Sequence, residues 1–384
     1  MRRLMLALVA AACAATSSPA QEAGPMVPER RLVVSRDTDF FGGDLQPLFD
    51  TTLEACQTLC LGDPACAAFT FNTRSNACFP KTGVTERKSY DGAVSAEVIA
   101  AGAEALARAE ARARDLGFLD AGELVAAREE AGAIGVRHSG GQWSVEELGD
   151  AARSAEAQGN LRDALSWTGA ALAQTDAAEL WLDYARLSRA YAASSSNGGE
   201  TQTHERRALL ASINAYLRAG PEAQRATALM QLAEALEASG QGRLMVPALR
   251  LAERLAPRDE IAQALDRAIA QYGFRITEHV VEADTAAPRI CAEFSEDLIR
   301  AGQEYAPFVR LPDPKLAVVS DERRICVTGV QHGERYDLTF RAGLPSAQGD
   351  ALVRDVPITA YVRDRAPALS FPGRAYVLPK SADA

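Results

Sequence analysis

Cysteine is the residue type with the greatest chemical potential in this chain of 384 residues. Of its seven cysteines, Cys13 lies in an N-terminal apolar run, and the others form a cluster and a distant pair. These six are Cys56, Cys60, Cys66, Cys78, Cys291 and Cys326. Clustered cysteines either bind metal as thiolates or form disulfides, and the cellular compartment decides between the two.

The first residues of the chain indicate export. Arg2 and Arg3 precede an apolar run over residues 4–15, and residues 18–20 offer small side chains to a signal peptidase. We therefore predict a signal peptide over residues 1–20 and a periplasmic or secreted protein.

A lipid anchor at Cys13 is the alternative fate of this leader. We weigh it lower because the preceding Ala10-Ala11-Ala12 lacks the leucine that is usual before a lipidated cysteine. No later segment has the roughly 18 continuous apolar residues that a membrane span requires, so we expect no transmembrane segment.

The charge of the chain argues against nucleic acid as a partner. The formal net charge is −10, and it becomes −12 when the leader removes Arg2 and Arg3 without any acidic residue. A polyanion would be repelled by such a surface. The hydrophobic fraction of 47% is typical of globular proteins and excludes a mainly disordered chain.

The clustered cysteines are expected to form disulfides. Their spacing lacks the paired Cys-x-x-Cys knuckles of a zinc site, and export disfavours free thiolates. We therefore expect no metal and no cofactor. The distant pair, Cys291 and Cys326, must belong to another domain, and each follows an isoleucine in a strand-like string, so we expect a bridge between adjacent strands or sheets.

A short helix is predicted to position the first four cysteines. Thr51 and Glu54 have the spacing of a capping box, which favours a helix from there to about Leu61. Cys56 and Cys60 then lie one turn apart on one face, so each must bond outside the helix. We favour the nested pairing, Cys56 with Cys78 and Cys60 with Cys66. The pairing of Cys56 with Cys66 and Cys60 with Cys78 stays open.

The segment around these cysteines resembles a PAN/Apple domain, which we assign to residues 27–98. The residues that carry the resemblance are the string from Phe41 to Asp44, the four cysteines, Asp63-Pro64-Ala65, the run from Phe69 to Asn72, and Phe79-Pro80-Lys81. The resemblance implies a helix packed on a curved antiparallel sheet. It also implies binding of proteins or carbohydrates.

Residues 100–272 are expected to be helical. They contain no cysteine and are rich in alanine, leucine, glutamate and arginine. Small residues recur where antiparallel helices would approach closely, which resembles degenerate tetratricopeptide repeats. They are Ala152, Gly159, Ala164 and Ala171, then Ala233, Gly240, Ala252 and Pro257. The alternative is an irregular alanine-rich bundle.

After Gly273 the pattern alternates with a period of two residues, which is typical of strands. Ile290, Ala292 and Phe294 show this pattern, and Gly and Pro separate several short runs of the kind. We predict a multidomain chain with a β-sandwich over residues 274–366.

The same region resembles the amino-terminal part of bacterial alpha-2-macroglobulins. The strings that carry the resemblance are Arg289-Ile290-Cys291, residues 305–309, residues 341–345, Tyr361 to Arg365, and residues 371–379. The family's relevant activity is trapping proteases through a bait segment and a thioester. No cysteine here begins the Cys-x-Glu-Gln string that a thioester needs. We expect residues 367–384 to start a truncated strand domain, and we suspect a truncated or split gene product.

An enzymatic role is not expected. The sequence lacks the zinc-protease, nucleophile-elbow, Walker and dinucleotide motifs. The four histidines, His138, His204, His279 and His332, are scattered. We place His138 in a solvent-exposed, glycine-rich loop over residues 132–141, and His332 in a turn between strands.

Two functions fit these features. The first is a non-catalytic docking segment of a periplasmic macroglobulin-like protease inhibitor, in which the bait and thioester regions are missing. The second is an independent exported adhesion or scaffold protein that binds carbohydrate or protein through its Apple domain.

Overall fold

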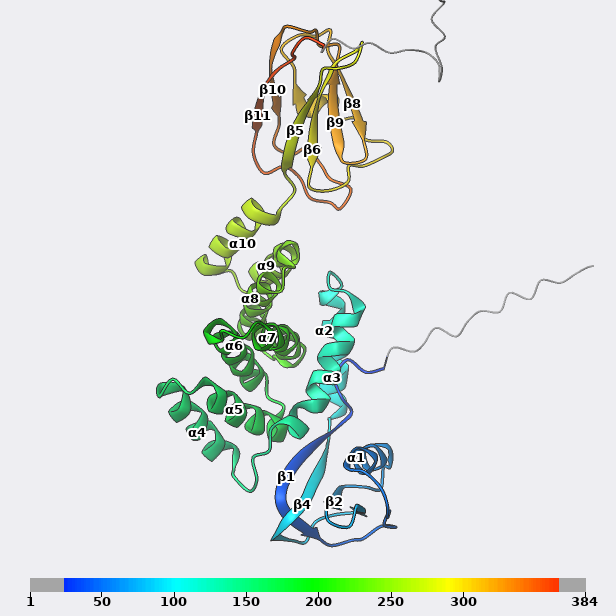
Figure 1. The fold of residues 1–384 in the computed structure, drawn as a ribbon, viewed down its shortest axis with the longest axis vertical. Helices are drawn as coiled ribbons and strands as arrows, with labels where there is room; N and C mark the ends of the chain where they lie inside the picture. The colour runs from blue at the N-terminus through cyan, green and yellow to red at the C-terminus, as the bar shows by residue number, and fades with distance from the viewer. Residues whose placement is uncertain (1–23, 366–384) are drawn as a thin grey trace, which may run out of the picture. The chain divides into compact units, whose positions relative to one another are not determined.

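The computed structural model describes residues 24–365, which form two compact units (Figure 1). The first unit ends at Ala262, and the second begins at Gln263. The predicted signal peptide, the alternative anchor at Cys13 and the predicted strand domain over residues 367–384 lie outside the described residues. No helix of the described part is long and apolar enough to cross a bilayer.

The first unit begins with a four-stranded antiparallel sheet in the order β1-β4-β2-β3. The strands are β1 (Arg30–Phe41), β2 (Ala68–Asn72), β3 (Ala77–Lys81) and β4 (Glu86–Ala100). The long β4 pairs with β1 from Arg30↔Ala100 to Phe41↔Glu86 and with β2 on its other side. The first and last strands of the module are therefore neighbours.

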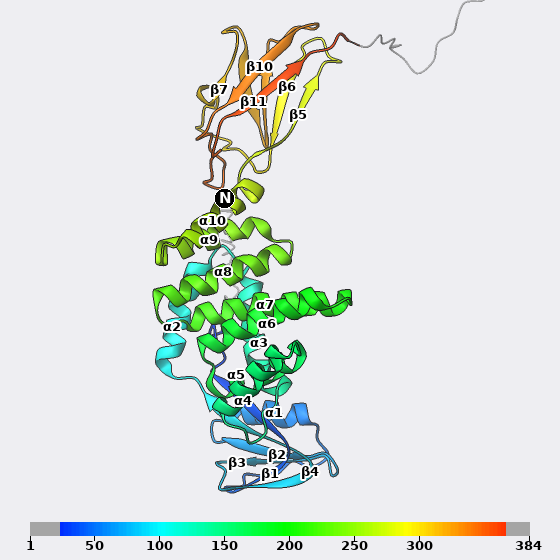
Figure 2. The same cartoon turned by 90° about the vertical axis from the view of Figure 1, so that its left-hand side faces the viewer.

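Helix α1 (Leu53–Gly62) packs on this sheet (Figure 2). Its N-cap is Thr52, whose hydroxyl oxygen accepts from the backbone N–H of Ala55 at 3.2 Å. The capping box predicted from Thr51 is therefore wrong by one residue. The reason is that the Thr51 N–H donates to the carbonyl oxygen of Asn76 at 3.0 Å, which holds Thr51 in extended pairing.

Helices follow from Ala103 to Tyr272, as the composition predicts. They are α2 (Ala103–Ala113), α3 (Ala121–Arg137), α4 (Val145–Ala157), α5 (Leu161–Thr175), α6 (Ala178–Ser194), α7 (Gly198–Arg218), α8 (Glu222–Ala238), α9 (Met245–Leu255) and α10 (Asp259–Tyr272), which crosses the boundary between the units. Successive helices from α4 to α9 contact one another, whereas α3 packs against α5 and α7.

Small residues line the contacts between these helices. Ala164, Ala171, Ala233 and Ala252 are all at most 1% exposed. The α4–α5 connection contains Gly159, with a φ of 75°, a left-handed conformation that glycine adopts without strain. Buried alanines let the helix backbones approach closely, as expected, whereas a Cβ atom at Gly159 or Gly240 would meet nothing within 4 Å, so the packing role expected for these two glycines is wrong.

The sheet and the helices are joined within the first unit. The Ser139 hydroxyl, after α3, donates to the carbonyl oxygen of Val34 in β1 at 2.9 Å. Arg31, also in β1, donates through Nε to the carbonyl oxygen of Ala173 in α5 at 3.1 Å. The sequence presented these parts as successive modules, and the structure shows that β1 contacts both helices.

The glycine-rich loop expected over residues 132–141 is wrong, because α3 continues to Arg137. Gly135 is a packing position, since a Cβ atom there would lie 1.8 Å from the carbonyl oxygen of Leu32 in β1. His138 is also not exposed to solvent. It is 8% exposed, and its Nε2 lies 2.9 Å from the Tyr184 hydroxyl of α6.

The second unit contains two antiparallel sheets. One has the order β5-β6-β9-β8, from β5 (Ile276–Glu282), β6 (Arg289–Phe294), β8 (Ala317–Asp321) and β9 (Arg324–Thr328). The other has the order β11-β10-β7, from β7 (Val309–Arg310), β10 (Arg335–Phe340) and β11 (Val356–Tyr361). Both sheets contribute to one buried cluster, with Phe294 from the first and Phe340 from the second.

Candidate functional site

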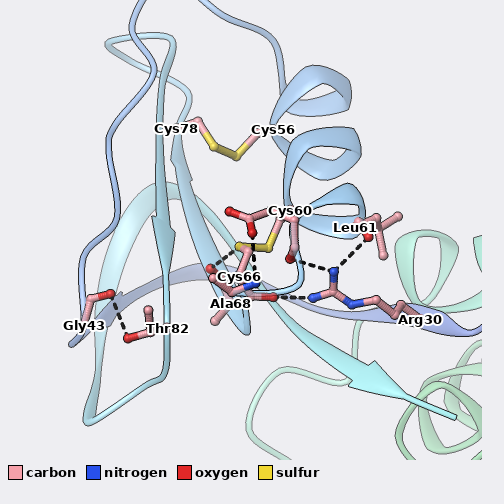
Figure 3. Close-up of a disulfide and its surroundings, with 11 residues drawn as sticks. Arg30, Gly43, Cys56, Cys60, Leu61, Cys66, Ala68, Cys78 and Thr82 are labelled. Atoms are coloured by element: carbon pink, nitrogen blue, oxygen red, sulfur yellow. Dashed lines mark hydrogen bonds between the residues drawn. A yellow bond between two sulfur atoms is a disulfide. The ribbon is translucent and has the colours of Figure 1, made fainter.

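Two disulfides anchor α1 in the first unit, one to strand β3 of the sheet and one to the loop that follows the helix (Figure 3). Cys56 bonds to Cys78 in β3 with a Cα–Cα distance of 5.6 Å, and Cys60 bonds to Cys66 after the helix with 5.2 Å. This is the nested pairing. All four side chains are fully buried. Because every sulfur of the cluster is bonded to another, these cysteines offer no thiolate to zinc.

Arg30 supports the same helix from the start of β1 (Figure 3). Its Nη1 donates to the carbonyl oxygens of Leu61 at 2.8 Å and Asp63 at 2.7 Å, and its Nη2 donates to that of Cys66. The last turn of α1 has no basic residue of its own. A guanidinium at this end satisfies carbonyls that helix geometry leaves unpaired and complements the negative end of the helix dipole.

This contact was not predicted from the sequence. Arg30 is separated from its three acceptors by 31 to 36 residues. Basic residues near a helix C-terminus are recognised by sequence only when they lie in the helix itself. Here the positive charge comes from Arg30 of β1, which the fold brings to the end of α1.

A helix that packs on an antiparallel sheet and is bonded to it by a disulfide is the arrangement that the resemblance to PAN/Apple domains implies. Residues 31–99 match the sequence profile of the PAN domain family. Residues 31–99 form a PAN domain. Its bounds are close to those expected from the sequence, and they include the whole of α1 and both disulfides.

Comparison with curated proteins gives a relative that matches a small part of the chain. The chain is 32% identical over 60 residues to the putative receptor protein kinase ZmPK1 of Zea mays. The matched segment is 16% of this chain and 7% of that protein. The chain therefore spans a small fraction of that relative.

A solved structure with limited similarity is native alpha-2-macroglobulin from Escherichia coli spanning domains MG0-NIE-MG1. It has 14% sequence identity and a TM-score of 0.23 over 26% of this chain and 35% of that chain. A score this low supports no inference about fold or function.

The PAN domain exposes aromatic rings next to cationic side chains where β1 and β4 pair. The Lys88 ammonium lies 5.0 Å from the centre of the Phe41 ring, and the Arg74 guanidinium lies 5.6 Å from that of Tyr90. Phe41 is 39% exposed and Tyr90 is 42% exposed. We call these four residues the aromatic–cation surface. Such pairs present flat apolar faces and charge together, which suits recognition.

The aromatic–cation surface was not predicted from the sequence. Phe41 was noted as part of the family resemblance, whereas Tyr90 was not singled out. The signal that could have found it is an exposed aromatic alternating with cations in one strand, as in Lys88 and Tyr90 of β4.

The third disulfide lies in the second unit. Cys291 of β6 and Cys326 of β9 are direct cross-strand partners, and their sulfurs are bonded. The bridge therefore joins adjacent strands of one sheet. Of the two arrangements that the sequence left open, this is the bond between strands.

The four histidines lie in separate elements. His138 follows α3, His204 lies in α7, His279 lies in β5, and His332 connects β9 to β10. Burial lowers the pKa of His138 to about 3, with Arg137 as the next largest cause. His138 is therefore neutral at physiological pH and acts as a buried hydrogen-bonding group against Tyr184. His332 contacts the carbonyl oxygen of Ala283 through Nε2 at 2.8 Å.

Proposed function

We propose that this chain is an exported, non-catalytic recognition protein that binds protein or carbohydrate through its PAN domain. The observation that carries the proposal is the disulfide-bonded PAN domain over residues 31–99. Its disulfides suit an oxidising compartment, which agrees with the leader that the sequence predicts.

The aromatic–cation surface is the part of this domain that we assign to recognition. Its two rings are 39% and 42% exposed, so part of each is available to a partner. An aromatic ring with an exposed face can stack on a sugar ring or pack against a protein side chain, and both interactions bury apolar area.

Binding of the purified full chain to peptidoglycan sacculi and to a glycan array tests this assignment for carbohydrate. Crosslinking to purified envelope proteins tests it for protein. The double variant F41A/Y90A should lose the retained ligand, because both exposed rings are removed. The matched control is Tyr361→Ala, which removes a 52% exposed tyrosine from the second unit. Retention that is equal in wild type and F41A/Y90A would contradict the assignment.

We propose in addition that the chain is a docking segment of a macroglobulin-like protease-defence protein. What supports this is the sequence resemblance of the strings that begin at Arg289 and end at Arg365, which include the strands β6 and β11. On this proposal the helical pairs α4–α5 and α8–α9 are tetratricopeptide-like repeats, and the two sheets of the second unit form a β-sandwich.

Labelling with methylamine separates trapping from docking. The chain has no Cys-x-Glu-Gln string, and its six cysteines within residues 24–365 are paired. The purified chain should therefore incorporate no methylamine, while a copurifying macroglobulin partner should be labelled. Incorporation into this chain would overturn the docking proposal.

A further inference from the structure

A cavity of about 470 Å³ lies in the first unit, where the PAN domain meets the helices. The end of β4 and the start of α2 form one side, and the turn between α5 and α6 forms another. Arg31 of β1 and Arg218 at the end of α7 also line it. The cavity is distinct from the aromatic–cation surface, because the two share no residue.

The lining of this cavity carries an excess of positive charge. Within the described part of the chain it holds three arginines, Arg31, Arg108 and Arg218, and one acidic residue, Asp176. The Arg31 and Arg218 side chains are only 8% and 9% exposed. Two buried guanidinium groups therefore share one carboxylate, and burial of unpaired charge is costly.

Asp176 does not satisfy both guanidinium groups equally. Its Oδ1 accepts from Arg218 Nε at 2.6 Å and from Trp181 Nε1 at 2.9 Å, whereas its Oδ2 is 3.9 Å from Arg31 Nη1. Burial is the largest cause that lowers the pKa of both arginines, and Asp176 offsets it only in part. The charge of this pair of arginines is thus incompletely compensated.

Two buried donors in the lining have no acceptor among the described residues. Arg218 Nη2 has no hydrogen-bond partner, although Nη1 of the same group donates to the Asn214 side chain at 2.6 Å. Arg108 Nε also has none, and its Nη1 is 3.3 Å from the exposed Glu104 carboxylate. Buried donors are nearly always paired in folded proteins, so the protein leaves these two guanidinium groups incompletely satisfied.

Two helix N-termini add to the positive electrostatic potential in the cavity. α6 begins beside the cavity after Ala177, and α2 begins there after Gly102, and neither has a side-chain cap. An uncapped N-terminus presents free backbone N–H groups and the positive end of the helix dipole. Such ends favour anions, as they do in phosphate sites.

We propose that this cavity binds a small ligand that carries a carboxylate or phosphate group. The lining arginines Arg31, Arg108 and Arg218 attract the oxyanion, which compensates the charge that Asp176 leaves. The volume exceeds that of an inorganic oxyanion, so it accommodates the body of a small organic acid as well. Because the cavity is lined by both β1 and helices, its occupant fastens the PAN domain to the helical region.

The test uses the purified full chain with sodium phosphate and sodium glucuronate as probes, sodium chloride at matched ionic strength, and glucose as a neutral control. We expect at least one of the two oxyanions to raise the melting temperature saturably above the chloride baseline and glucose to have no effect. Saturation by phosphate alone identifies a free phosphate or phosphoryl group, and saturation by glucuronate alone identifies an organic carboxylate. No saturable shift with either probe would overturn the proposal.

The matched variants are Arg108→Gln and Arg153→Gln. Arg108 is 39% exposed, so the change should leave the fold intact, and Arg153 in α4 is paired with Asp150 as Arg108 is with Glu104. We expect about tenfold weaker binding for R108Q, which is the loss of one charge-assisted hydrogen bond, and unchanged binding for R153Q. Equal binding by wild type and R108Q would contradict the site. F41A/Y90A should bind the oxyanion normally, which separates this proposal from that for the PAN surface.

Discussion

The carbonyl oxygen of Leu32 in β1 lies where a side chain at Gly135 of α3 would begin, because a Cβ atom built there would be 1.8 Å away. Gly132, in the same helix, would meet nothing nearer than the Pro28 ring at 3.9 Å. The two glycines differ only in what faces them. Contact between the PAN domain and the helices thus depends on the absence of one methyl group.

Gly135→Ala should destabilise the first unit by about 1–3 kcal/mol, since β1 and α3 must separate to admit the methyl group. Gly132→Ala should be neutral or stabilising by up to about 1 kcal/mol, because alanine favours helix and the site has room. Urea unfolding of both variants measures the difference. Equal stability of the two would show that the contact is not rigid.

The buried His138 should make the first unit less stable in mild acid. Its folded pKa of about 3 is below the unfolded value of about 6.5, so the unfolded chain binds the proton first as the pH falls. The contribution of neutral His138 to the free energy of unfolding is therefore complete above pH 6.5 and is lost progressively as the pH falls to 3. Between pH 7.5 and 5.5 the loss should be about 1.4 kcal/mol.

Comparison of wild type, His138→Gln and Tyr184→Phe in urea at these two pH values isolates this contribution. H138Q should lose that part of the pH dependence, because no imidazole remains to titrate. Y184F removes the partner hydroxyl but keeps the histidine buried, so it should keep the dependence while costing about 1 kcal/mol at both pH values. An unchanged pH dependence in H138Q would exclude His138 as its source.

The two disulfides of the PAN domain should contribute unequally to its stability. They close loops with sequence separations of 22 and 6 residues. In the chain-entropy description these correspond to about 3 kcal/mol for Cys56–Cys78 and about 2 kcal/mol for Cys60–Cys66. Double alanine variants of each pair, compared by urea unfolding, should differ by about 1 kcal/mol because all four sulfurs are equally buried. A larger loss for the Cys60–Cys66 pair would contradict the loop argument.

The local features of this fold were accessible from sequence. Cys56 and Cys60 lie one helical turn apart on one face, so each was expected to bond outside the helix, although spacing alone left two pairings open. Alternation around Ile290 and Ile325 likewise indicated the strands that carry Cys291 and Cys326. In each case the informative residues are close together in the chain, and the spacing of their side chains is enough to assign them to a helix or a strand.

Features that depend on distant segments were not accessible. The sequence predicts a loop at Gly135 and His138. A glycine that lets a strand pack closely on a helix cannot be distinguished, from its sequence neighbours, from a glycine in a turn. Arg30 reaches carbonyls more than thirty residues away. Asp176 and Arg218 come together only because α5 and α7 both pack against α3 and α6. No spacing rule in the sequence connects the two residues.

We propose that the PAN domain lies in an oxidising compartment, because its four cysteines are paired as disulfides. The most direct test is mass spectrometry of the native protein, alkylated without reduction and isolated from its cell of origin. Cys56, Cys60, Cys66, Cys78, Cys291 and Cys326 should all be unmodified by the alkylating reagent, and peptides linked as Cys56–Cys78, Cys60–Cys66 and Cys291–Cys326 should be found. Alkylation of all six side chains would contradict the account.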